Sequence, residues 1–229
     1  MAAIYLIRHG QASFGKANYD QLSERGWQQG RVLGRWLAGK VSPQAVVGGS
    51  LQRHRETAEA IASGFGRDLP DMRVMAGLDE FDHTAVIECY RPQWADRARM
   101  ARDLQAFPKP AKAFQDAFVA AVVRWASGDH DSDYRETWPE FKARVLTAFE
   151  ELVAFADGSD VLVTTSGGPI SVMVQHLLGL DDARTLGLNE VIANTSVTRV
   201  LYSGGRRSLA VFNNYSHLEA EDPALVSFR

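Results

Sequence analysis

Short apolar runs alternate with longer amphipathic segments along this chain, and the alternation predicts strands and helices in turn. Each run is aliphatic or β-branched and no longer than one buried strand. The expected strands are residues 3–7, 45–48, 72–75, 161–164, 195–202 and 208–212. The last two form a hairpin across a glycine pair. Strands that alternate with helices favour an α/β fold, here a three-layer α/β/α sandwich with a mostly parallel sheet and helices on both faces.

The helical segments carry recognisable start and stop signals. Ser23 is expected to cap a helix that runs to Leu37, with Gly39 closing it. Further helices are expected at residues 51–63, at residues 139–155 with Pro139 as the first residue, and from Pro169 onwards. The pattern stays helical over residues 83–157. The sequence therefore predicts a single domain, residues 1–229, with a helical cap inserted at about residues 83–157.

Composition and charge exclude several classes of protein. The chain has 229 residues, a hydrophobic fraction of 45% and a formal net charge of −3, which suits one large globular domain and argues against a nucleic-acid partner. It shows neither a leader peptide nor an apolar run long enough to span a membrane. The single cysteine, Cys89, excludes an internal disulfide. We expect a cytoplasmic protein without a membrane partner, and the sequence leaves a homodimer open.

Three chemically suggestive residues follow the first strand directly. Arg8 offers a fork of donors that suits phosphate, and His9 can act as a nucleophile or proton carrier near neutral pH. Gly10 allows close approach of an anion and a positive φ. Ligands of open α/β sheets bind at the carboxyl ends of strands, which is where this tripeptide stands. A surface turn with incidental charge explains so short a motif equally well.

Two further clusters repeat this arrangement of strand end and helix start. Residues 50–58 place Arg53 at a helix amino terminus, and Gly167 and Gly168 stand between a buried strand and the helix expected from Pro169. Helix-start N–H groups and consecutive glycine amides both favour anions. We therefore expect Arg53 to face Arg8 across one anion-binding pocket.

The ordered motifs resemble the histidine phosphatase superfamily, the phosphoglycerate mutase-like group. The resemblance rests on Arg8-His9-Gly10, Leu22-Ser23 with Gly26 and Gln29, Ser50-Leu51-Gln52-Arg53 with Thr57-Ala58, Leu78-Asp79-Glu80, Gly167-Gly168-Pro169-Ile170, and Asn213 with His217-Leu218. These matches span nearly the whole chain. They imply a phosphomonoesterase that acts on a small phosphorylated metabolite.

The resemblance also implies roles for individual residues. His9 would take the phosphoryl group, giving a phosphohistidine that water hydrolyses, while Arg8 and Arg53 hold the phosphoryl oxygens. Glu80 would protonate the leaving oxygen, with Asp82 as the rival acid. Such an acid needs its protonated form favoured near neutral pH, which a neighbouring phosphate does. Arginines and helix-start amides can stabilise the transition state without a metal or other cofactor.

The chain departs from the family pattern at Ser166, which stands where a second active-site histidine is usual. Either Ser166 and the following amides do a weaker version of that work, or another histidine takes the place, with His54, His83 and His217 as the candidates. Alternatively the chain binds phosphorylated ligands as a regulatory protein and turns them over slowly or not at all. Losing one donor to a transition-state oxyanion costs about a hundredfold in rate, so we expect reduced activity.

Smaller features remain open. In the family that the chain resembles, an asparagine at the position of Gly15 often contacts phosphate. We expect Asn18 or Ser13 to make that contact here, together with Ser166 and Gly167. A phosphoglycerate mutase is a minor alternative, because it must retain the phosphoryl group in an enclosed site. Four aromatic residues of the insertion are expected to pack between the cap helices and the sheet. Alternatively, one of them lines a substrate mouth. They are Trp125, Trp138, Phe141 and Phe149.

Overall fold

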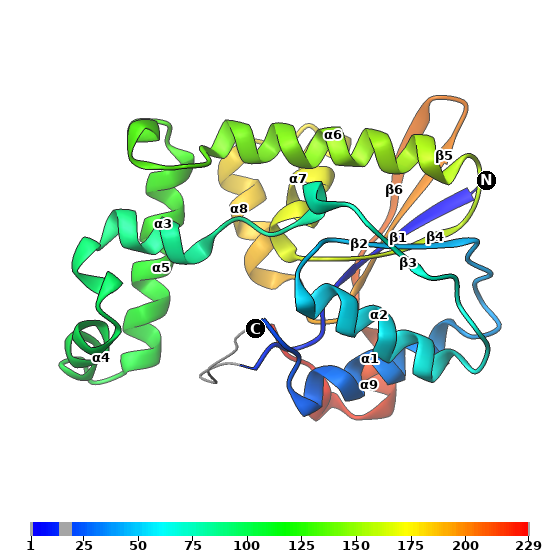
Figure 1. Ribbon diagram of the computed structural model, residues 1–229, viewed down its shortest axis with the longest axis horizontal. Coiled ribbons are helices and arrows are strands. Elements are labelled where there is room, and N and C mark those ends of the chain that lie inside the picture. The colour runs from blue at the N-terminus through cyan, green and yellow to red at the C-terminus, as the bar shows by residue number, and fades with distance from the viewer. Residues whose placement is uncertain (1, 14–19, 229) are drawn as a thin grey trace. The chain divides into compact units, whose positions relative to one another are not determined.

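The computed structural model describes residues 2–13 and 20–228, and within them six strands form a single sheet. They are β1 (Ala2–Arg8), β2 (Ala45–Gly48), β3 (Met72–Val74), β4 (Val161–Thr165), β5 (Val197–Ser203) and β6 (Arg206–Asn214). Their order is β3-β2-β4-β1-β5-β6 (Figure 1). The pairs β3/β2, β2/β4 and β4/β1 are parallel, whereas β5 runs antiparallel to both of its neighbours. The predicted mostly parallel sheet is confirmed.

Helices cover both faces of this sheet. They are α1 (Glu24–Leu37), α2 (Gln52–Phe65), α6 (Trp138–Ala156), α7 (Gly167–Leu178), α8 (Asp182–Val191) and α9 (Ser216–Glu221). Figure 1 shows α1, α2 and α9 on one side of the strands and α7, α8 and the second half of α6 on the other. This arrangement confirms the predicted α/β/α layers. The core is aliphatic: Ile4, Leu6 and Ile7 of β1 are fully buried, because β1 lies between two other strands and both faces carry helices.

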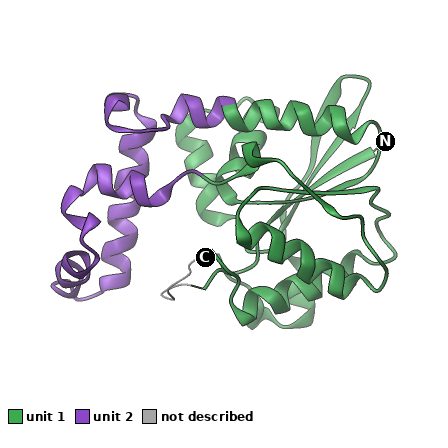
Figure 2. Cartoon of the chain, in the orientation of Figure 1, with its two compact units in different colours: residues 1–80, 144–229 green, residues 81–143 purple. Residues whose placement is uncertain are grey.

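The chain divides into two units, which Figure 2 distinguishes by colour. Unit 1 comprises residues 1–80 and 144–229, and unit 2 comprises residues 81–143. Unit 2 is helical, with α3 (His83–Tyr90), α4 (Arg97–Gln105), α5 (Pro110–Ala126) and the start of α6. The insertion was expected at residues 83–157; the later part of that range is the carboxyl half of α6, which belongs to unit 1.

Local signals in the sequence explain several boundaries. Ser23 caps α1 by accepting a hydrogen bond from the Gly26 N–H at 3.1 Å, as its position predicts. The β5–β6 hairpin turns at Gly204 and Gly205, which both have positive φ. Helix α7 begins at Gly167 rather than at Pro169, so that expected start is two residues late.

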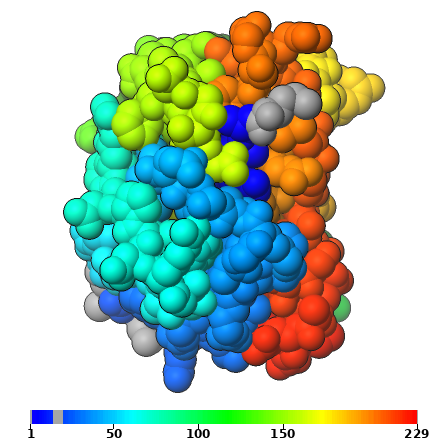
Figure 3. All heavy atoms as spheres, turned by 90° about the vertical axis from the view of Figure 1, so that its right-hand side faces the viewer, coloured from blue at the N-terminus to red at the C-terminus, as the bar shows by residue number. Residues whose placement is uncertain are grey.

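The opposite end of the parallel strands is where the chain begins. The Ala3 N–H donates to the Asp160 carboxylate at 2.8 Å, so the start of β1 is held beside the turn that precedes β4. Figure 3 looks at this side, where the dark-blue start of β1 lies between the yellow-green residues before β4 and the orange hairpin. Among the described helices, none is long and apolar enough to cross a membrane.

Candidate active site

The carboxyl ends of β1, β2 and β4 meet at one edge of the sheet. Arg8 pairs with Thr165 in the β1/β4 register, and Gly48 pairs with Thr164 in the β2/β4 register. The His9 N–H donates to the Thr165 carbonyl at 2.8 Å, so the parallel pairing continues past the end of β1. The three motifs that the sequence singled out therefore lie together, and all of them belong to unit 1.

His9 is buried and held in one tautomer. Its Nδ1 lies 2.7 Å from the Gly10 carbonyl oxygen, which can only accept, so Nδ1 carries the proton. The second ring nitrogen, Nε2, then keeps its lone pair. Burial, followed by the positive charges of Arg53 and Arg8, holds the pKa of His9 well below its usual range. The imidazole is therefore neutral and nucleophilic at neutral pH.

Gly10 is required by packing rather than by its backbone angle. Its φ is not among the positive values of the described residues, so the positive φ that a glycine permits is not used here. A Cβ built on Gly10 would lie 2.6 Å from the Gly26 carbonyl oxygen, so α1 packs directly on this backbone. The Gly10 N–H donates to Thr57 Oγ1 at 3.0 Å, and that hydroxyl donates to the Arg53 carbonyl at 2.6 Å. Thr57 thus connects the loop after β1 to helix α2.

Arg53 is buried at the start of α2 and lies against a carboxylate that the sequence did not reveal. Its Nη1 donates to Asp20 Oδ1 at 2.6 Å, and Asp20 Oδ2 also accepts the Gln52 N–H at 2.8 Å. The buried Nε of Arg53 has no hydrogen-bond partner among the residues that the structure describes. Since a buried donor without a partner is costly, this nitrogen is a ready contact for an anion.

Arg8 anchors the end of β1. Its Nη1 donates to the carbonyl of Ile192 and, at 2.9 Å, to that of Phe228. The carbonyl of the neighbouring His9 accepts from Asn194 Nδ2 at 3.0 Å. The expected contact of Arg8 with phosphoryl oxygens stays a prediction, because its guanidinium also serves the carboxyl-terminal segment.

The two candidate acids differ in their surroundings. Glu80 Oε2 accepts the Gly168 N–H at 3.1 Å, so this carboxylate lies at the start of α7 in unit 1. Asp82 lies in unit 2 and caps α3, where it accepts the N–H groups of Thr84 and Ala85, each at 3.0 Å. Helix capping accounts for Asp82 without a catalytic role. Glu80 therefore stays the predicted general acid.

Ser166 contacts one of the three histidines that the sequence offered. His54 Nε2 lies 2.8 Å from Ser166 Oγ, and both side chains are fully buried. His217 lies elsewhere in unit 1, 3.1 Å from Thr195 Oγ1, and His83 belongs to unit 2. The proximity of His54 to His9, with ring centroids 5.9 Å apart, places a second imidazole at the site from a different element.

The other predicted phosphate-binding residues are Asn18 or Ser13 and Gly167. Asn18 lies outside the described residues. Ser13 is buried, and its hydroxyl donates to the Leu22 carbonyl at 3.0 Å. Gly167 packs against the Asn189 side chain, which a Cβ would strike.

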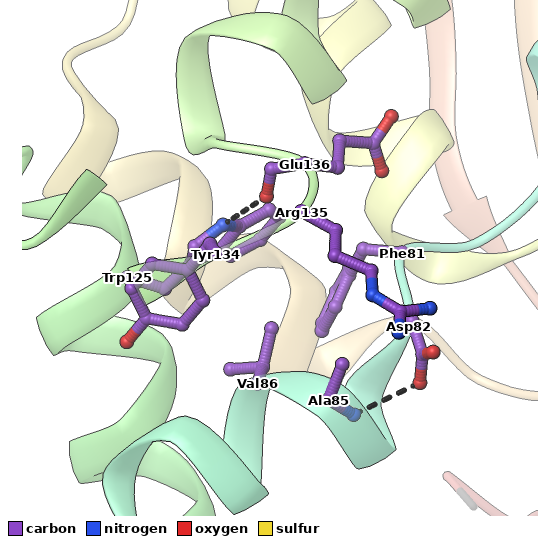
Figure 4. A pocket seen from close by; sticks show the side chains of 8 residues that line it. All are labelled: Phe81, Asp82, Ala85, Val86, Trp125, Tyr134, Arg135 and Glu136. Atoms are coloured by element: carbon purple, nitrogen blue, oxygen red, sulfur yellow. Dashed lines mark hydrogen bonds between the residues drawn. The ribbon is translucent and has the colours of Figure 1, made fainter. Parts of the chain in front are cut away.

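A small cavity of about 60 Å³ lies within unit 2 (Figure 4). It is lined by Phe81, Asp82, Ala85, Val86, Trp125, Tyr134, Arg135 and Glu136. Trp125 packs against Phe81 with ring centroids 4.8 Å apart and donates its indole N–H to the Glu136 carbonyl at 2.8 Å. Trp125 therefore packs within unit 2, as expected, and the alternative that one of these aromatic residues lines a substrate mouth stays a prediction.

Comparison with known proteins identifies the fold and the family. Similar solved structures include a phosphoglycerate mutase from Bacillus anthracis (18% identity, 95% of each chain, TM-score 0.66). An α-ribazole phosphatase from Shigella flexneri is also similar (19% identity, 93% of this chain and 96% of that one, TM-score 0.62). So is a mutant phosphoserine phosphatase from Entamoeba histolytica in complex with phosphoserine (17% identity, 95% of this chain and 100% of that one, TM-score 0.65).

No curated protein sequence matches the chain at a significant level. The family model of the histidine phosphatase superfamily (branch 1) matches residues 4–215. This range holds every described residue of the site, from Arg8 to Ser166, and most of the chain. The chain therefore belongs to the histidine phosphatase superfamily, branch 1.

Proposed function

We propose that this chain is a metal-independent phosphomonoesterase that transfers the phosphoryl group of a small metabolite to His9. The hydrogen bond from His9 Nδ1 to the Gly10 carbonyl is the observation that carries the proposal. It fixes the tautomer of the neutral imidazole, so that the Nε2 lone pair can attack phosphorus. Two arginines and the amides at the start of α7 supply positive charge for the equatorial oxygens. The phosphatases and the mutase of similar fold act on, or are bound to, small phosphorylated compounds.

The reaction needs two displacements. In the first, His9 Nε2 forms a bond to phosphorus, the bond to the substrate oxygen breaks, and Glu80 gives that oxygen a proton. In the second, water attacks phosphohistidine, Glu80 takes a proton from the water, and the His9–phosphorus bond breaks. The products are the dephosphorylated metabolite and inorganic phosphate, and both His9 and Glu80 return to their starting states.

Ser166 favours one competing function. A hydroxyl is shorter than an imidazole and uncharged, so a site that holds only Ser166 at this position stabilises the transition state less. In that case the chain binds phosphorylated ligands as a regulatory protein and turns over slowly or not at all.

Hydrolysis of an aryl phosphate, together with trapping of acid-labile phosphoenzyme, separates these functions. We expect labelled enzyme and turnover in the wild type and neither in His9→Ala. His217→Gln is the matched control, because it removes another buried imidazole and should keep the label. A wild type that binds phosphate but shows no label and no turnover would establish the binding function instead.

A further inference from the structure

The Ser166 hydroxyl is used in an unusual way for its position. Ser166 precedes α7, and a serine there ordinarily caps the helix with its side chain. No such capping bond forms in this case. The hydroxyl instead lies 2.8 Å from His54 Nε2, in a fully buried position one residue after Thr165, whose carbonyl accepts the His9 N–H. It is thus held at the catalytic edge of the sheet by an imidazole.

The far side of the His54 ring faces a carboxylate. His54 Nδ1 lies 3.7 Å from Asp79 Oδ1 and has no hydrogen-bond partner among the described residues. The Asp79 carboxylate is held in place by Ser50, which donates its N–H at 2.6 Å and its hydroxyl at 2.5 Å. A Cβ at Gly49 would strike both His54 Nδ1 and Asp79 Oδ1. Glycine is therefore needed here to leave room for this pair.

The His54 ring has Asp79 on one side and Ser166 on the other, and it lies beside the ring of His9. The order of groups is a fixed carboxylate, a buried imidazole and a hydroxyl, with the imidazole ring 5.9 Å from the ring of the nucleophile. A carboxylate on one side of an imidazole stabilises a proton on the ring, and the opposite nitrogen then donates. The serine hydroxyl would then turn its own proton towards the pocket.

We propose that Asp79, His54 and Ser166 act as one unit, which takes up a proton when a phosphoryl dianion binds and donates a hydrogen bond to that dianion through the Ser166 hydroxyl. The proton comes from solvent and rests on the His54 ring. His54 Nε2–H then donates to Ser166 Oγ, and the Ser166 O–H donates to a phosphoryl oxygen. Ser166 is the catalytic residue of the unit, because it touches the phosphoryl group, and His54 is a positioning residue. The inference rests on the proposed function for its substrate class.

The charges around His54 explain why the proton should arrive with the ligand. Burial and the positive charge of Arg53 hold the pKa of His54 well below its usual range. His9 also faces the ring and adds no negative charge. Asp79 lies on the opposite side, and Glu80 accepts from an amide two residues beyond Ser166. A bound dianion adds negative charge close to Arg53 and shifts this balance towards the imidazolium.

A double-mutant cycle tests whether Ser166 and His54 act together. We expect Ser166→Ala and His54→Ala each to lower kcat/KM for an aryl phosphate by about ten- to a hundredfold. The double variant should be no worse than the worse single variant, because either change removes the same donor. Exchanging the residues, His54→Ala with Ser166→His, should recover at least about tenfold over the double alanine variant, since it returns an imidazole to the pocket.

Proton uptake tests the charge on His54 without any turnover. Tungstate is a tetrahedral dianion near neutral pH, and its binding can be measured by calorimetry in buffers of different ionisation enthalpy. We expect His54→Gln to take up about one proton fewer per bound tungstate than the wild type, because any proton that Glu80 takes up is common to both proteins. His54→Gln keeps a neutral donor at similar reach, which protects the fold. His217→Gln is the control and should take up the wild-type number.

The outcomes are distinct. Additive losses in the cycle, or unchanged proton uptake in His54→Gln, overturn the inference. A wild type that forms no phosphoenzyme yet takes up the proton through His54 would reject the phosphatase proposal and retain this unit as a dianion-binding device. Uptake of about one proton fewer in His54→Gln, together with a non-additive cycle, establishes it.

Discussion

Replacing His217 should reduce the sensitivity of the fold to acid. His217 is only 2% exposed, and its pKa is lowered from 6.5 to about 4 by burial and by the positive charge of Lys40. Its Nε2 lies 3.1 Å from Thr195 Oγ1, while Nδ1 has no hydrogen-bond partner among the described residues. The ring therefore has little to gain from a proton in the folded state, and the unfolded chain takes one more readily.

The direction and size of the effect follow from this difference in pKa. Between about pH 6.5 and pH 4 the unfolded state binds a proton that the folded state does not, so the free energy of unfolding falls as the pH falls. The fall is about 1.4 kcal/mol per pH unit, which gives about 2 kcal/mol at pH 5. Below about pH 4 both states are protonated and the contribution of His217 no longer changes. His9 and His54 act in the same direction, because their pKa values are also lowered.

Urea unfolding of the wild type and His217→Gln at pH 7.5 and pH 5 measures the effect. Glutamine can still bond to Thr195, so the variant should fold and lose about 2 kcal/mol less than the wild type between the two pH values. His176→Gln, at an exposed position of α7, is the control for removal of an imidazole and should follow the wild type. Equal losses in wild type and His217→Gln would refute the reasoning.

Three further substitutions test the packing of the site. Gly10→Ala should cost about 1–3 kcal/mol in urea unfolding and slow turnover, because its Cβ would meet the Gly26 backbone, which cannot move aside. Gly167→Ala should stay within about 1 kcal/mol of the wild type, since its Cβ meets only the end of the Asn189 side chain; a larger loss than Gly10→Ala would contradict this. Thr57→Val should cost about 1–3 kcal/mol in the same assay, because the Gly10 N–H loses its buried acceptor, and wild-type stability would contradict it.

Most of the fold could be predicted from local sequence signals, namely apolar runs, helix caps and turn glycines. Apolar runs located the strands, Ser23 marked the start of α1 through its side-chain oxygen, and the pair Gly204-Gly205 marked the hairpin by its tolerance of positive φ. These signals depend on neighbours within a few residues, so the sequence contains them directly. The start of α7 was misplaced because Pro169 is a strong signal, although the two glycines before it already adopt the helix.

The site required information that is not local. His54 and Ser166 are separated by 112 positions, and Arg53 and Asp20 by 33. Their contacts depend on the order of the strands, in which β4 lies between β2 and β1. Once that order is known, the first turn of α2 must face the residue after β4, which distinguishes His54 from His217. The proximity of His54 to position 166 was visible in the sequence only as a missing histidine and three candidates.

The burial of His9 should also set the lower pH limit of this protein. A pKa well below the usual range keeps His9 neutral as the solution is acidified, so its titration should not limit activity in weak acid. The same property makes the folded state less stable there, and unfolding should end activity first. A variant of Arg53 can separate the two effects. After burial, the positive charge of Arg53 is the largest cause of the lowered pKa of His9. Arg53→Met should raise the pKa of His9, so the fall of kcat/KM on acidification should begin closer to neutral pH. Far-UV circular dichroism should stay that of the folded protein at that pH. An acid limb that coincides with unfolding in both proteins would show that Arg53 does not govern the charge of His9.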